Sequence, residues 1–229
     1  NIFSKLIEEN SIKNFIYKMY TNKSDIENVL KNESEIIDAI YTENRIDLEQ
    51  PLNKILNDFT KGHKSSVKKE YKELSYHIYD HTNYKKNQIL EMMTLHETVT
   101  NKKTRSKQTW FVNEEMIINK QGFLVKVLDN DKLISYAFFF HNKFYAIYFS
   151  SCTNRETFNS FKNITHKTIW KSIEYLKNIK CKYLTLGHTN TLYYKNNIVD
   201  ERSNIERFTA SFGGHQQNYI VYKRIPKII

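Results

Sequence analysis

Cysteine, proline and glycine are all scarce in this sequence. Its 229 residues include two prolines, five glycines and two cysteines, Cys152 and Cys181. There is neither a CxxC pair nor a Cys/His cluster with the spacing of zinc ligands, which argues against both a disulfide framework and a structural zinc site. We therefore predict that both cysteines are reduced thiols in a cytoplasmic protein.

A long apolar segment is also missing. The longest strongly apolar run is LISYAFFF (133–140), far shorter than the roughly 20 residues that cross a bilayer. The given residues contain no pattern of a signal peptide, with its charged start and small-residue cleavage site. We expect a protein without stable membrane insertion, located in the cytoplasm or at the inner face of the membrane.

Apolar and basic residues are present in quantity. Hydrophobic residues make up 40% of the chain and aromatic residues 14%, which excludes a disordered protein. The net charge is +10 and the isoelectric point is about 9.3, which favours anionic partners such as phosphates, CoA, RNA or lipid headgroups. The alternative is an ordinary solvated basic surface, because lysine is simply abundant.

The first forty residues have apolar positions at helical spacing, as at Ile12, Phe15, Ile16 and Met19. This spacing predicts two or three short helices. Since the chain begins with Asn rather than Met, we expect residues 1–44 to be a helical segment left from a larger or preceding domain. Residues 45–229 are then the main domain.

The middle of the chain alternates basic and amphipathic patterns. Pro51 suits the first turn of a helix over 51–59, and a basic helix is predicted over 62–74. Residues 75–80 alternate like a strand, and residues 83–100 have the spacing of an amphipathic helix.

From Gly122 the pattern changes to strands joined by tight turns, the first of them at Asn130-Asp131. The predicted elements are strands 122–129, 132–140 and 143–151, helix 165–179, strand 182–187, helix 203–212 and strand 217–223. We predict an α+β fold in which helices flank a mixed, mostly antiparallel sheet.

This order of elements resembles that of the GNAT fold. HKTIWKSIEYLKNIKCKYLTLG (166–187), followed by NIERFTASFGG (204–214), resembles the C-terminal half of Fem-like aminoacyl- and acyltransferases of the GNAT superfamily. LNDFTKGHKSSVKKEYKEL (56–74) resembles the basic helix of the same family. The resemblance covers roughly residues 45–223.

The resemblance implies an enzyme that transfers an activated acyl group to an amine. The donor would be acyl-CoA or aminoacyl-tRNA, and no metal is implied. The acceptor would be a small molecule or a cell-envelope or glycan component, including one linked to a nucleotide or a lipid. Two alternatives stay open: an ordinary acetyl-CoA-dependent N-acetyltransferase of amino sugars or small molecules, and a non-catalytic module that binds RNA or an anionic ligand.

One departure concerns the donor. Ordinary GNAT enzymes hold the CoA pyrophosphate in a Gln/Arg-x-x-Gly-x-Gly/Ala loop, whereas no glycine occurs between Ser151 and Thr165. Fem-like proteins also commonly lack this loop. We therefore expect acetyl-CoA to bind more weakly than in typical GNAT enzymes.

Transfer to an amine needs a base, because an amine of ordinary pKa is protonated at pH 7. Glu97 is the first candidate, with His96 beside it as a substrate-binding residue. The alternative is that His96 is a core histidine with its hydrogen bonds satisfied and that Glu97 lies on a solvated face. His188 follows Gly187 at the end of a predicted strand and is a second catalytic candidate, against the alternative of an ordinary loop histidine.

The resemblance also implies that backbone N–H groups from Ile147 to Ser150 polarise the acyl carbonyl. Ser150 is accordingly a candidate for substrate binding, and Tyr148 could protonate the leaving group. The alternative for Tyr148 is a packing role.

Basic residues complete the candidate set. Lys64, Lys68 and Lys72 recur at i, i+4, i+8 and suit a phosphate of the donor or acceptor, although a solvated face is the alternative. NKKTRSK (101–107) is a second basic patch. Arg207 is a candidate for contact with a donor phosphate.

Overall fold

The structure is a computed structural model that describes residues 16–21, 26, 37–158, 160–194, 197–199 and 203–223. The chain divides into two compact units. Unit 1 comprises Asn1–Asn44, His188–Ala210 and His215–Ile229, and unit 2 comprises Arg45–Gly187 and Ser211–Gly214. The sequence-based division into residues 1–44 and 45–229 remains a prediction about domains.

Unit 2 contains a mixed sheet with the strand order β7-β6-β5-β4-β3. Its strands are β3 (Leu74–Tyr79), β4 (Gly122–Asp129), β5 (Lys132–His141), β6 (Tyr145–Thr153) and the start of β7 (Tyr183–Tyr194). Neighbours are antiparallel except for β6 and β7, which are parallel. The predicted three-strand meander is confirmed.

The turn between β4 and β5 shows how local chemistry directs this meander. Asn130 and Asp131 both have positive φ, 43° and 71°. A two-residue hairpin turn of this kind matches the right-handed twist of the strands, and Asn and Asp tolerate it better than most residues.

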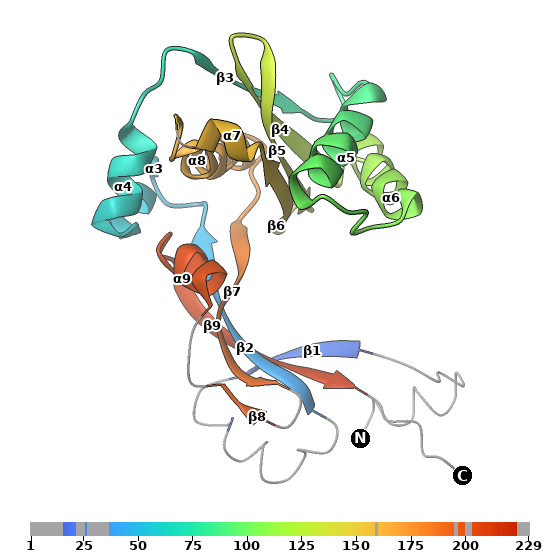
Figure 1. Cartoon of the computed structure of the whole chain (residues 1–229). Coiled ribbons are helices and arrows are strands. Elements are labelled where there is room, and N and C mark those ends of the chain that lie inside the picture. The colour runs from blue at the N-terminus through green and yellow to red at the C-terminus, as the bar shows by residue number, and fades with distance from the viewer. Residues whose placement is uncertain are drawn as a thin grey trace, which may run out of the picture. The chain divides into compact units, whose positions relative to one another are not determined.

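Helices lie on both faces of this sheet. They are α3 (Leu52–Asp58), α4 (Lys61–Lys68), α5 (Asn87–Thr100), α6 (Lys107–Ile118), α7 (Arg155–Phe158) and α8 (Ile164–Asn178). Helices α5 and α6 cover one face of β4 to β6, and α8 lies on the other (Figure 1). No helix in the described ranges has both the length and the apolar character required to cross a membrane.

Adjacent phenylalanines on β5 fill the two cores of unit 2. Because side chains alternate along a strand, Phe138 and Phe139 point to opposite faces. Phe138 belongs to the cluster under α5 and α6 with Met92 and Trp110, whereas Phe139 stacks on Phe123, whose ring is 4.5 Å from that of Tyr175 in α8. The sheet is therefore buried on both sides.

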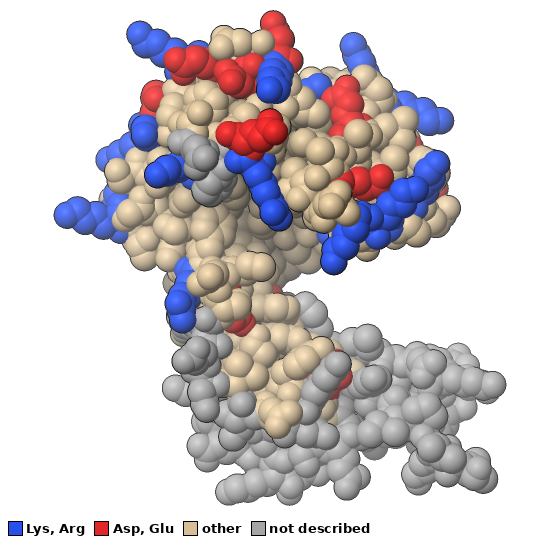
Figure 2. All heavy atoms as spheres, viewed as in Figure 1, with Lys and Arg blue, Asp and Glu red and all other residues tan. Residues whose placement is uncertain are grey.

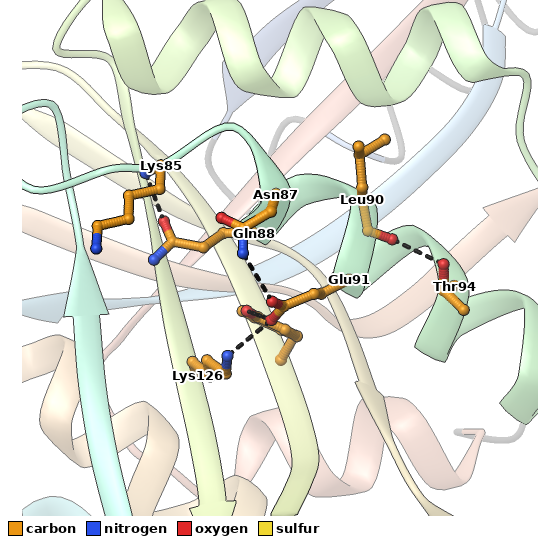
Figure 3. A network of polar contacts seen from close by, with 8 residues as sticks. Lys85, Asn87, Gln88, Leu90, Glu91, Thr94 and Lys126 are labelled. Carbon is orange, nitrogen blue, oxygen red and sulfur yellow. Dashed lines mark hydrogen bonds and ion pairs between the residues drawn. The ribbon is translucent and has the colours of Figure 1, made fainter. Parts of the chain in front are cut away.

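A polar network anchors the start of α5 to the sheet (Figure 3). The Glu91 carboxylate accepts hydrogen bonds from Lys126 Nζ at 2.7 Å, the Tyr136 hydroxyl at 2.8 Å and Asn87 Nδ2 at 3.1 Å. These bonds outweigh desolvation and lower the pKa of Glu91, while burial raises the pKa of Tyr136. The network fixes the helix that also carries Glu97.

We expect Glu91→Gln to reduce the free energy of unfolding by about 1–3 kcal/mol at pH 7, since it removes charge-assisted hydrogen bonds from a partly buried site. Because the folded pKa of Glu91 lies below the unfolded value of about 4.3, this difference is fully present above that pH and shrinks as the pH falls further. Urea unfolding from pH 3 to 8 measures it. An unchanged difference at pH 3, or one no larger than that of the exposed control Glu115→Gln, would contradict it.

Unit 1 contains strands in the order β1-β9-β2-β7, with β8 paired to β7. The bounds are β1 (Ile16–Thr21), β2 (Ile37–Asp47), β8 (Asn197–Ile198) and β9 (His215–Lys223), with α9 at Asn204–Ala210. Strand β1 pairs with β9 along its whole length. The prediction of helices was therefore wrong for residues 16–21 and 37–44, which are strands, and right at Ile26, which is helical. Its other positions lie outside the described residues.

Candidate active site

Strands β6 and β7 separate within unit 2. They pair in parallel at Tyr145↔Tyr183, Ala146↔Leu184 and Ile147↔Thr185, and in the described part of the sheet no later pair joins them. Strand β6 continues to Thr153. From Tyr148 onward, one edge of β6 therefore has no strand pairing with β7.

A β-bulge lies on β6 at the point of separation. Phe138 pairs with Ser150 and Phe139 pairs with Tyr148, so Phe149 is the extra residue. A bulge interrupts the ladder of hydrogen bonds and changes the direction of neighbouring side chains. Backbone amides in such a place can meet an acyl carbonyl, in line with the prediction for residues 147–150, which stays a prediction.

Arg105 is held against this bulge. Its Nη1 donates a hydrogen bond of 2.9 Å to Oγ of Ser150, a residue with 6% of its surface exposed. Its Cζ lies 5.3 Å from the ring centre of Trp110 and 5.2 Å from that of Phe149. Two aromatic rings and one hydroxyl thus fix the guanidinium in place.

Arg105 also lines a cavity of about 400 Å³. Its walls are formed by Met93, Glu97, Lys103, Thr104, Arg105, Ser106 and Lys107. Glu97 comes from α5, and the polar residues from 103 to 107 come from the α5–α6 loop and the first turn of α6. The surface over α5 and α6 carries a group of basic side chains (Figure 2).

His96 supports the loop from beneath. Its side chain is buried, its Nδ1 lies 3.2 Å from the Thr104 hydroxyl, and its ring packs edge-on against Trp110 at 5.4 Å. Burial, and next the charge of Arg105, lower the pKa of His96, so the imidazole is neutral at pH 7. In the described structure His96 thus holds the cavity wall.

Two other groups on β6 are protonated at neutral pH. Burial raises the pKa of the Cys152 thiol to about 12 and that of the Tyr148 phenol to about 12. Cys152 is therefore a poor nucleophile. Tyr148 pairs with Phe139 on the α8 face and donates to Ser151, whereas Ser150 pairs with Phe138 on the α5–α6 face.

The sequence matches no protein-family model and no curated protein. Solved structures do resemble the fold. The crystal structure of FemX superimposes with a TM-score of 0.62 at 11% identity, covering 96% of this chain and 76% of FemX. L-PGS from Bacillus licheniformis gives 0.58 at 9% identity, covering 96% and 71%, and a tandem GNAT protein from the clavulanic acid pathway gives 0.51 at 9%, covering 96% and 66%.

The chain has a Fem-like GNAT fold. Within this fold, unit 2 brings three of the predicted site residues to one face of the sheet. Glu97 lines the cavity, His96 supports its wall, and Ser150 bonds to the same Arg105 that lines it. Tyr148 lies on the opposite face.

Two other predicted site residues, His188 and Arg207, belong to unit 1. The strand expected to end at Gly187 continues to Tyr194, so His188 lies inside β7 and its placement at a strand end was wrong. His188 is exposed, stacks on Tyr41 at 3.9 Å, and its Nδ1 lies 2.6 Å from the Tyr219 hydroxyl. Arg207 is exposed on α9.

The predicted lysine stripe is shorter than expected. Helix α4 ends at Lys68, so Lys72 lies beyond it, between α4 and β3, and the stripe over three turns was wrong. Lys61, Lys64 and Lys68 place like charges about one turn apart along α4, and their repulsion disfavours a longer helix. Lys64 Nζ donates to the Asn57 side-chain oxygen at 3.1 Å, and Lys68 is exposed.

Arg105 is the residue whose role sequence reasoning missed. It was assigned only to a basic patch, and its contact with Ser150 spans 45 positions. Helix α6 was missed with it, because its apolar residues are spread around the helix rather than along one face. A usable signal for the start of α6 was Ser106, a common N-cap residue. Its hydroxyl accepts a hydrogen bond from the backbone N–H of Thr109.

Proposed function

We propose that the protein is an N-acyltransferase or N-aminoacyltransferase that moves an activated acyl group onto the amine of a cell-envelope, glycan or small-molecule acceptor. The observation that carries this proposal is the separation of β6 from β7 at a β-bulge. At this bulge Ser150 bonds to Arg105, which lines a cavity together with the Glu97 carboxylate. Amide-forming transfer needs these parts: amide donors for a carbonyl, and a base within a bounded space.

In the proposed reaction, the acceptor ammonium first gives a proton to the Glu97 carboxylate. The neutral amine then attacks the acyl carbonyl, whose oxygen accepts hydrogen bonds from β6 backbone amides near Phe149. The C–N bond forms, the bond from the carbonyl carbon to sulfur or oxygen of the donor breaks, and the second amine proton goes to that leaving atom.

The two faces of β6 suit the two substrates. Glu97 and Arg105 lie on the α5–α6 face, where the acceptor amine would enter. Tyr148 lies on the α8 face with its phenol protonated, where it can pass its proton to the leaving group of the donor and take up the second amine proton in exchange. The carbonyl would then sit at the edge of β6 that does not pair with β7.

Side chains in the first turn of α8 are engaged with α4 and with Phe212. His166 packs on His63 of α4 at 4.4 Å and near Phe212 at 5.9 Å, and Lys167 Nζ donates to the Val67 carbonyl at 3.2 Å. The preceding segment contains the short helix α7 in place of a glycine-rich loop. These contacts favour a donor other than acetyl-CoA, with aminoacyl-tRNA as the main alternative.

We therefore expect acetyl-CoA to bind with a Kd weaker than about 1 µM. Isothermal calorimetry of the full chain measures it. Tighter binding, together with backbone NMR shifts at residues 164–167, would contradict the expectation and assign an ordinary CoA donor.

The proposed function is tested by titrating the chain separately with acyl-CoA and with aminoacyl-tRNA. The matched controls are the deacylated forms, free CoA and uncharged tRNA. A transferase should bind the acylated form of its donor more tightly than the deacylated form. The backbone amide NMR signals of residues 148–150 should then shift. Equal binding of charged and uncharged tRNA, with no shift at the bulge, would instead point to a non-catalytic RNA-binding protein.

A further inference from the structure

Arg105 is a half-buried cation without a counter-charge in the part of the chain that the structure describes. Its guanidinium makes one hydrogen bond there, to Ser150, and no ion pair. A guanidinium has five N–H donors in a planar fork that suits carboxylate or phosphate oxygens. Arg105 is half-buried, and this burial lowers its pKa. Such a group is complementary to an anion.

The other charged residues that line the cavity also lack ion pairs among the described residues. Lys103 and Lys107 form no ion pair with any described residue, and within the same ranges Glu97 forms none with these lysines or with Arg105. The cavity of about 400 Å³ is thus lined by three cations, from the α5–α6 loop and the start of α6, and by one carboxylate from α5. Its excess of positive charge attracts an anionic group, while the carboxylate attracts an ammonium group.

The first turn of α6 adds to this preference for an anion. Ser106 is its N-cap, and Arg105, Ser106 and Lys107 line the cavity beside the helix start. Backbone N–H groups at the start of a helix carry partial positive charge.

We propose that this cavity binds an acceptor that carries an acidic group beside its amine, with a carboxylate or phosphate held by Arg105, Lys103 and Lys107 and the ammonium facing Glu97. This rests on the proposed function and names the acceptor class for it. A cavity of this volume is at the small end for ligand sites, so it suits an amino-acid-sized part of the acceptor.

A matched set of three small amines tests the proposal. β-Alanine joins the amine to a carboxylate, O-phosphoethanolamine joins it to a phosphate, and ethanolamine has no acidic group. Each is titrated into the full chain without donor, and backbone amide shifts of residues 103–107 are followed by NMR. We expect saturable shifts with at least one acidic amine. The affinity for ethanolamine should be at least about tenfold weaker, which is a difference of about 1.4 kcal/mol in binding free energy. The tighter of the two acidic amines identifies the acidic group.

The double variant Lys103→Gln/Lys107→Gln should weaken binding of the acidic amine about tenfold or more. Its matched control is Lys85→Gln/Lys132→Gln, which removes the same charge from exposed lysines that do not line the cavity. The control should bind as the parent does. Thermal melting checks that both variants remain folded.

Three results would overturn the proposal: no saturable shift with any of the three amines, equal affinity for ethanolamine, or undiminished binding in the lysine variant. Because binding is measured without donor, it is separable from transfer. Binding of acidic amines without any transfer leaves this site standing and counts against the proposed function. Transfer to amines that have no acidic group, with no preference for acidic amines, would support the proposed function and contradict the proposed acceptor class.

Discussion

Replacing Glu97 by Gln is expected to lower kcat by about 10²–10⁴ with little change in donor affinity. The amide keeps the size and hydrogen-bonding capacity of the side chain but cannot take the proton of the acceptor ammonium. Glu97 is half-buried on α5 and lines the cavity beside Arg105, so the change acts where the amine is proposed to bind. Single-turnover transfer and donor titration measure the two quantities.

His188→Ala is the informative comparison for this variant. His188 belongs to unit 1, where it contacts Tyr41 and Tyr219, and we expect its loss to reduce kcat much less. If Glu97→Gln is fully active and His188→Ala is inactive, the base belongs to β7. If both variants are fully active, the acceptor amine arrives neutral or loses its proton through water.

The second large effect is expected at Gly213. Gly213 has φ of +68°, and a Cβ at this position would lie 2.5 Å from the Asp58 carbonyl oxygen. The turn holds Phe212 in the core of unit 2, where its ring is 5.1 Å from that of Phe59. Gly213→Ala combines left-handed strain with overpacking, so we expect a loss of about 2–6 kcal/mol in the free energy of unfolding.

Gly62→Ala is the matched control for that substitution. Gly62 lies in α4, and a Cβ there meets no atom within 4 Å. Alanine favours the helix, so this variant should be as stable as the parent or up to about 1 kcal/mol more stable. Urea unfolding distinguishes the two variants, and equal stability of Gly213→Ala and the parent would contradict the account of the turn.

The strands of unit 2 were predictable because their signals are local. Alternating apolar residues and the Asn130-Asp131 turn determine which residues pair in the hairpin. β1 was not predictable in the same way. Its apolar spacing favours a helix, but its backbone pairs with β9, about 200 positions later, and tertiary pairing overrides local propensity.

Gly187 misled the assignment of His188. A glycine after an apolar strand indicates a turn, yet Gly187 adopts φ of +99° inside β7 and the strand continues. Glu97 was predicted because transfer to an amine needs a base, and its role stays a prediction. The placement of Arg105 depends on Ser150, Trp110 and Phe149, which only the folded chain brings together. Such contacts have no signature in one sequence.

The central claim is that this chain forms an amide bond, and mass spectrometry of the product tests it most directly. The full chain is incubated with an isotopically labelled aminoacyl-tRNA or acyl-CoA and an acidic amine, and the label is sought in the amine. We predict labelled amide with the parent chain and about 10²–10⁴ less initial rate with Glu97→Gln. Labelled acid from hydrolysis alone, or equal amide formation with and without the protein, would contradict the claim.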